Sequence, residues 1–169
     1  MPNFQNEKKL VLDYWNEVDK CNNQDLEKII SKYTSNNFHM RCTHPFNELD
    51  GVEQVANQLW VPIKKSFKPI QRRLDIFYAG ENSLDENGGV WISSMGHLMG
   101  VFNKNFFGLQ PHYKSSLLRF AEFYKVEGNK ITEGAIFLDI FNFMQQLGLS
   151  IIPESTGLVC VTPGPMKHK

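Results

Sequence analysis

Residues 116–149 restrict the fold of this chain more than any other stretch. Side chains alternate with a period of two through residues 116–126 and again after residue 130, which is typical of half-buried β-strands. Gly128 and Asn129 lie between the two runs and favour a tight turn. After Asp139 the spacing of apolar residues becomes helical and stops at Gly148. The stretch therefore predicts a β-hairpin followed by a short amphipathic helix.

The register of this hairpin decides which side chains share a face. A two-residue turn pairs Val126 with Ile131, and counting outward places Glu122 and Asp139 on the same face. That face also carries the aromatic residues Phe120, Tyr124 and Phe137. A carboxyl group among aromatic rings is poorly solvated, so its pKa rises. We therefore expect the chemistry of this protein on that face.

Helical and strand patterns alternate in a simple order before the hairpin. Helices are predicted from residue 6 to 20, from residue 23 onward, and from a capping box at Asp50 and Glu53 through Trp60, with Pro62 as its limit. Strands are predicted over residues 38–44, 70–79 and 90–102. Helices followed by an antiparallel or mixed sheet indicate an α+β fold, in which the helices cover one curved sheet face and leave a pocket.

Length and charge exclude several classes of function. A chain of 169 residues suits one domain, which we place at residues 1–150, with a Pro- and Gly-containing tail over residues 151–169. The 18 basic and 18 acidic residues balance, so no nucleic-acid or anionic-membrane partner is expected. No apolar run is long enough to span a membrane, so a cytoplasmic protein is expected. Three distant cysteines fit reduced thiols better than a disulfide framework.

Several motifs together resemble a known family. They are residues 118–133 (LRFAEFYKVEGNKITE) with Asp139 and the QQLG run, and residues 43–51, 71–77 and 94–100. The sequence resembles the SnoaL-like polyketide cyclases of the NTF2-like superfamily, and in particular one domain of the tandem SnoaL-like proteins. The resemblance covers most of residues 5–150 and implies an NTF2-like cone. Since that fold carries enzymes, binding modules and transport adaptors, the resemblance says more about fold than about substrate.

The resemblance implies two alternative functions. The first is a cofactor-free cyclase, isomerase or hydrolase that uses acid/base chemistry on a small apolar carbonyl compound. The second is a ligand-binding or interaction module that holds a similar molecule without turnover. In both cases a homodimer is expected, because NTF2-like sheets usually pair through their convex faces. The apolar residues expected on that face are Leu117, Ala121, Phe123, Ile136, Leu138 and Ile140.

Asp139 is the first catalytic candidate. It falls where the SnoaL-like cyclases carry their acid/base aspartate, just before the last helix. A general acid or base is served by a carboxyl group with a raised pKa at the wall of a dry pocket. The alternative is that Asp139 caps the helix that follows it, since an acceptor side chain suits a helix start.

Glu122 and His97 are the other catalytic candidates. Glu122 lies in an apolar strand, where a carboxylate needs a partner such as His97, Arg73 or Arg41. It is either a functional acid or half of a buried ion pair. His97 has a pKa range suited to proton transfer, although a histidine on an apolar face is often a structural core residue. The family's cyclases carry a His and a Gln on the strand of residues 118–124, and this sequence has neither there.

The remaining predictions concern binding. The side chains expected to contact the ligand are His44, Arg41, Arg73, Trp60, Tyr124 and Phe120. No metal site is expected, because strand alternation places His39 on the other face of the strand from Cys42 and His44. No phosphate-binding loop or nucleophile motif is present, so no cofactor is expected.

Overall fold

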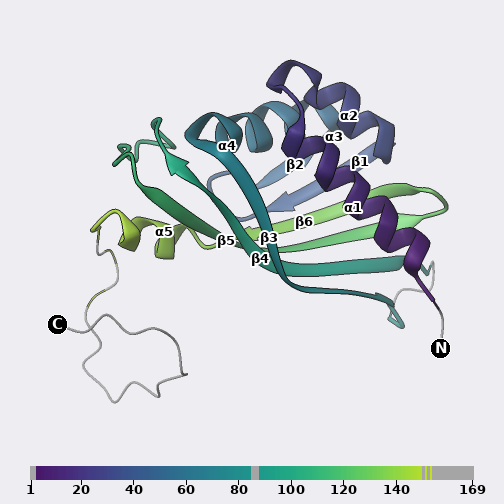
Figure 1. Ribbon diagram of the computed structural model, residues 1–169. Helices are drawn as coiled ribbons and strands as arrows, with labels where there is room; N and C mark the ends of the chain where they lie inside the picture. Colours follow the sequence, from purple (N-terminus) through teal and green to yellow (C-terminus); the bar gives the residue numbers. More distant parts are fainter. Residues whose placement is uncertain (1–2, 85–87, 150, 152, 154–169) are drawn as a thin grey trace, which may run out of the picture.

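A curved six-stranded sheet organises the computed structural model, which describes residues 3–84, 88–149, 151 and 153. The helical segments are α1 (Gln5–Lys20), η1 (Asn23–Asp25), α2 (Leu26–Tyr33), α3 (Gly51–Gln54), η2 (Val55–Trp60), α4 (Val61–Ser66) and α5 (Ile140–Gln146). The strands are β1 (Thr34–Cys42), β2 (Glu48–Asp50), β3 (Phe67–Glu81), β4 (Val90–Phe102), β5 (Ser115–Glu127) and β6 (Lys130–Leu138). Figure 1 shows α1 to α4 together over one face of the sheet, with α5 at one end. The predicted α+β arrangement is confirmed.

The first helices form where helical periodicity predicts them. Helix α1 buries Val11, Tyr14, Trp15 and Val18, which recur at intervals of three and four residues. Helix α2 then turns the chain into β1. The aromatic residues of α1 thereby face the sheet, and we call the sheet face that they cover the inner face.

The third helix is longer than predicted. Segments α3, η2 and α4 follow one another without a break over residues 51–66, so the expected end at Pro62 is wrong. Pro62 lies in the first turn of α4, where a missing N–H is tolerated. The turns just before it, Val55–Trp60, are a π-helix, a rare form that is frequent at functional sites.

The sheet is mixed and has the strand order β2-β1-β6-β5-β4-β3. Strand β1 runs parallel to β6, with Met40 opposite Gly134, and the other pairs are antiparallel. The short edge strand β2 was not predicted. At the other edge β3 covers 15 residues and extends beyond the predicted strand at both ends.

A β-bulge changes the register of the hairpin between β5 and β6. Val126 pairs with Ile131 as predicted, but Lys125 pairs with Glu133, so Thr132 is an extra residue on β6. Beyond the bulge every β6 side chain is therefore on the opposite face from the predicted one. The inference that Phe137 and Asp139 share the face of Glu122 is wrong for this reason.

The two sheet faces differ in exposure. Phe120, Glu122 and Tyr124 are buried on the inner face. Ile136 and Leu138 are buried there too, so placing them on the outer face was wrong. On the outer face the exposed apolar side chains are Ile76, Tyr78, Met95, Leu117 and Phe137. The outer face is still apolar, but through a different set of β6 residues.

Two further predictions from the sequence concern the cysteines and membrane-spanning helices. Cys21 and Cys42 are free thiols, whereas Cys160 and most of the predicted tail lie outside the described residues. In the part of the chain that the structure describes, no helix is both long and apolar enough to cross a membrane.

Candidate functional site

A carboxylate–arginine–carboxylate triad lies between α1 and the inner face of the sheet. Arg72 Nη1 donates to Glu122 Oε1 over 2.7 Å. The same guanidinium donates from Nε to Asp19 Oδ2 over 2.9 Å and from Nη2 to Asp19 Oδ1 over 3.2 Å. The exposed fractions of the side chains are 0% for Glu122, 6% for Arg72 and 16% for Asp19. Strands β5 and β3 and helix α1 each contribute one member.

Aromatic rings enclose the guanidinium of Arg72. Its Cζ lies 4.9 Å from the ring centre of Trp15, 5.3 Å from that of Trp60 and 5.1 Å from that of Phe120. Stacked rings attract a cation, and they also keep water away from it. The triad is therefore held in a largely dry, rigid setting.

Five polar atoms beside the triad have no hydrogen-bond partner of normal geometry among the described residues. They are Tyr14 Oη, Trp15 Nε1, Trp60 Nε1, Tyr124 Oη and Glu122 Oε2. Each buried polar atom left unpaired costs about 1–3 kcal/mol. We call the triad and these residues the interior cluster. Its unpaired atoms make it the best candidate in the fold for binding a polar group.

The members of the interior cluster act on one another electrostatically. Burial raises the pKa of Glu122, and the positive charge of Arg72 opposes that rise. Burial also raises the pKa of Tyr14 and of Tyr124, and the Glu122 charge adds to both shifts. Although burial opposes the charge of Arg72, the two carboxylates raise its pKa. Burial therefore favours the protonated form of Glu122 more than in a solvated glutamate.

Local structure positions the cluster. Consecutive residues Tyr14 and Trp15 both face inward from α1, and the π-helix η2 ends at Trp60. On the sheet, Gly134 of β6 lies opposite Tyr124. A Cβ atom at Gly134 would lie 3.1 Å from Cε1 of the Tyr124 ring, so glycine makes room for this tyrosine.

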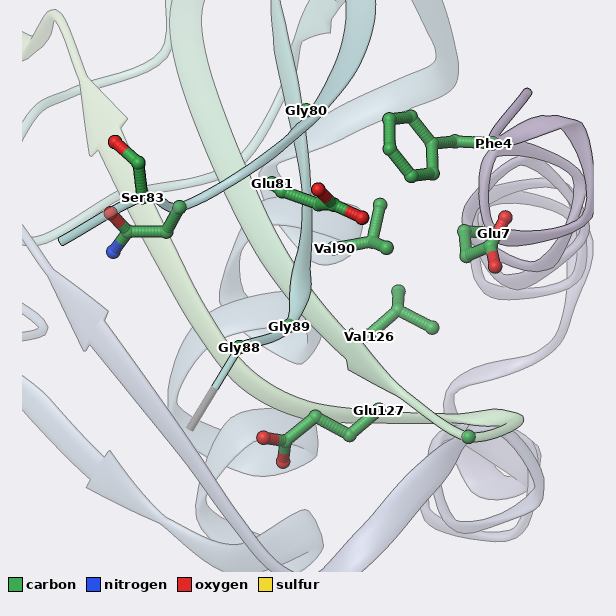
Figure 2. Close-up of a pocket in the computed structure, with 12 residues that line it drawn as sticks. Phe4, Glu7, Gly80, Glu81, Ser83, Gly88, Gly89, Val90, Val126 and Glu127 are labelled. Atoms are coloured by element: carbon green, nitrogen blue, oxygen red, sulfur yellow. The ribbon is translucent and has the colours of Figure 1, made fainter. Parts of the chain in front are cut away.

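Of two cavities beside α1, one reaches the interior cluster and the other lies beyond it. The side cavity, about 420 Å³, lies between α1 and β3, and Trp15, Asp19 and Arg72 line it. The end cavity, about 800 Å³, lies at the start of α1, beside the β3–β4 and β5–β6 connections. Figure 2 shows Phe4, just before α1, and Glu7 of α1 facing Val90 and Val126 across it.

The end cavity continues the inner face past the cluster. Val126 precedes the turn of β5 and lies two residues from Tyr124, which is about 6.6 Å along a strand at 3.3 Å per residue. Both side chains are buried on the same face. The mouth of this cavity carries the carboxylates of Glu7, Glu81 and Glu127.

Four of the predicted site residues meet in the interior cluster or against it: Glu122, Trp60, Tyr124 and Phe120. The expectation that Glu122 has a buried cationic partner is confirmed, but the partner is Arg72 and not His97, Arg73 or Arg41.

Asp139 lies outside the cluster and caps α5. Its Oδ1 accepts a hydrogen bond from the Asn142 backbone N–H over 2.9 Å. Its side chain is 36% exposed, and Oδ2 lies 4.0 Å from Arg119 Nη1. The capping alternative is the one that the geometry bears out.

The other predicted residues are also remote from the interior. His97 Nδ1 lies 3.0 Å from Asp75 Oδ2 on the outer face, where Arg73 is exposed. Arg41 pairs with Glu133 over 3.0 Å, also on the outer face. His44 is exposed in the loop after β1. In the part of the chain described here, no group of three His, Cys, Asp or Glu side chains could hold a metal ion.

Sequence reasoning missed four members of the cluster: Tyr14, Trp15, Asp19 and Arg72. The α1 residues carried a signal, because Tyr14 and Trp15 bring polar atoms into an otherwise apolar helix face. Asp19 carried none, since a charged residue near the end of a helix is usually solvated.

Solved structures with the same fold support the architecture. AclR from Streptomyces galilaeus, a candidate hydroxylase, is 17% identical with a TM-score of 0.69, and the match covers 90% of this chain and 87% of that one. A candidate SnoaL-like polyketide cyclase from Jannaschia is 13% identical with a TM-score of 0.65, and the match covers 88% of this chain and 94% of that one. An NTF2-like protein from Burkholderia thailandensis is 13% identical with a TM-score of 0.59, covering 84% and 96%. No family model and no curated protein matches the sequence. The chain therefore has the SnoaL-like, NTF2-like fold that its motifs resemble.

Proposed function

We propose that this protein binds a small, uncharged and mostly apolar molecule and transfers a proton to or from it through Glu122, without a cofactor. One observation carries the proposal. The Glu122 carboxyl is wholly buried, with Oε1 bound by Arg72 and Oε2 unpaired among the described residues. A buried carboxyl group with a free oxygen and a raised pKa is suited to accept and return a proton.

The end cavity is the place for the body of the ligand. Its volume of about 800 Å³ lies within the range of about 300–1,000 Å³ for small-molecule sites. Phe4, Val90 and Val126 offer it apolar surface. Although Glu127 is paired with Lys125 over 3.1 Å, the carboxylates of Glu7 and Glu81 disfavour an anion, and the apolar surface disfavours any charged ligand.

The reaction class is removal of a proton next to a carbonyl group. Glu122 Oε2 takes the proton as the C–H bond breaks. The C–H electron pair forms a C=C bond, and the C=O π pair moves to the oxygen, which gives an enolate. Such a step begins both aldol-type cyclisation and double-bond isomerisation. The sequence resemblance and the fold favour this class, and several solved structures of the fold are named as candidate polyketide cyclases.

A hydrogen-exchange assay tests this step before the natural substrate is known. The probe is 1-tetralone in D₂O, and NMR follows deuterium entering next to its carbonyl group. The wild-type protein should accelerate this exchange, and Glu122→Gln should reduce the acceleration by at least about a hundredfold, the usual scale for a lost general base. Asp139→Asn is the matched control and should exchange like the wild type. Equal rates for wild type and Glu122→Gln would refute the role of Glu122.

A second candidate, ligand binding without turnover, has one observation in its favour. Glu122 has no exposed surface and already has Arg72 as a partner, as expected of a structural ion pair. Under this alternative 1-tetralone binds the wild-type protein with no acceleration of exchange.

A further inference from the structure

We infer that Tyr14, Trp60 and Tyr124 form a hydrogen-bond-donor subsite that holds an uncharged acceptor oxygen of the ligand beside Glu122. The inference rests on the proposed function, because it assumes that a ligand enters the interior. It adds a specificity role for three residues on three different elements: α1, η2 and β5.

The count of unpaired groups favours an acceptor on the ligand. Among the unpaired interior atoms, Trp15 Nε1 and Trp60 Nε1 can only donate, and the two tyrosine hydroxyls can donate as well. Glu122 Oε2 is the single carboxylate oxygen in that set. A ligand group rich in lone pairs, such as a ketone, quinone or ester oxygen, satisfies more of these atoms than a hydroxyl or an amine.

The three donors are neighbours in the interior. The Tyr14 and Tyr124 rings meet edge to face with centres 5.6 Å apart. A hydrogen-bonding interaction with the Trp60 indole lowers the pKa of Tyr14, and one with the Tyr124 hydroxyl lowers the pKa of Glu122, although neither contact has normal hydrogen-bond geometry. These groups therefore lie close to one another without hydrogen bonds of normal geometry among themselves.

The backbone around Trp60 supports a functional role. Trp60 ends the π-helix Val55–Trp60, and its side chain is fully buried against Arg72. A π-helix is a local irregularity that occurs frequently at functional sites.

Charge excludes the ionic alternatives. Asp19 and Glu122 outnumber Arg72 in the triad, and three glutamates surround the mouth of the end cavity. An anion is therefore repelled at the mouth and in the interior. An ammonium ion has no lone pair for the donors and would lie near the Arg72 guanidinium.

Four bicyclic probes of similar size test the subsite. They are 1-tetralone, tetralin, 1-aminotetralin and 1-naphthoate, and calorimetry measures the dissociation constant of each. 1-Tetralone should bind at least about tenfold more tightly than the other three. Tyr14→Phe, Tyr124→Phe and Trp60→Phe should each weaken 1-tetralone binding by about two- to tenfold, the range for one neutral hydrogen bond. Tetralin binding should stay unchanged.

Trp91→Phe is the matched control. The Trp91 Nε1 atom is also buried and unpaired among the described residues, but this indole lies on the outer face with Tyr78 and Ser93. Its replacement should leave all four dissociation constants unchanged. Urea unfolding without ligand checks each variant, and Tyr14→Phe should be at least as stable as the wild type, because it removes a buried unpaired hydroxyl.

The outcomes separate the two proposals. If no probe binds, the proposed function fails and the subsite fails with it. If 1-tetralone and tetralin bind equally, or the 1-tetralone preference survives all three donor variants, the subsite is refuted while ligand binding stands. A preference for 1-aminotetralin or 1-naphthoate would refute the acceptor-oxygen class.

Discussion

Replacing Arg72 with methionine would leave Glu122 buried without a cationic partner. The arginine makes three hydrogen bonds to the two carboxylates, and its side chain is 6% exposed. Removing one partner of a buried ion pair costs about 3–5 kcal/mol. Domains of this kind have about 5–15 kcal/mol of unfolding free energy, so the variant should fold with a reduced margin. Methionine fits the ring of aromatic side chains that now holds the guanidinium.

The loss should depend on pH in a defined direction. Burial already raises the pKa of Glu122 above its ordinary value, and the variant loses Arg72, the main group that opposes that shift. A group whose folded-state pKa is raised stabilises the fold fully below its unfolded-state pKa, here 4.5, and loses that contribution as the pH rises through the folded-state value. The unfolding free energy of Arg72→Met should therefore lie furthest below that of the wild type at alkaline pH.

Urea unfolding followed by tryptophan fluorescence measures this effect at about pH 5 and about pH 8. Comparing Arg72→Met with the Arg72→Met/Glu122→Gln double variant isolates the carboxyl group. The second change should recover most of the lost free energy at about pH 8 and little of it at about pH 5. A double variant no more stable than Arg72→Met at either pH would refute the reasoning.

Three further predictions follow from single positions. Asp139→Ala should lower the unfolding free energy by about 1 kcal/mol through loss of the α5 cap, whereas Asp139→Asn should be nearly neutral in thermal unfolding. The wild-type protein should be a dimer by light scattering at micromolar concentration, and Phe137→Lys on the apolar outer face should make it a monomer; a monomeric wild type would contradict this interface. Gly96→Ala should destabilise the β3–β4 pair in urea unfolding, because the added methyl group would collide with the Arg73 carbonyl oxygen, and a neutral result would contradict the close approach.

Periodicity predicted the elements well because burial on one face leaves a regular trace in the sequence. The helical spacing in α1 and the alternation in β5 both follow from packing against a single core. The need of Glu122 for a cationic partner was also predictable, since a lone carboxylate in an apolar strand is costly. Periodicity could not predict which side chains face inward beyond a bulge, because the extra residue shifts the alternation by one.

Two such irregularities account for the main errors about the site. On β6 the extra residue Thr132 moves Asp139 away from the face of Glu122. On β3 the register shifts between Leu74 and Ile76, so Asp75 is the extra residue. Counting back from the inward Phe77 in steps of two would place Arg73 inside, but the bulge places Arg72 there instead.

The β3 bulge and the interior cluster therefore depend on each other. If residue 75 paired regularly and the strand alternated without a bulge, Arg72 would lie opposite Met99 on the outer face, and the inner face would hold Glu122 without its guanidinium. The same irregularity turns the Asp75 carboxylate outward, where it meets His97 Nδ1. β-Bulges concentrate beside functional sites because they re-aim one side chain without disturbing the rest of the sheet. A bulge that brings an arginine onto a buried glutamate is thus an argument for function in the interior that strand periodicity could not have provided.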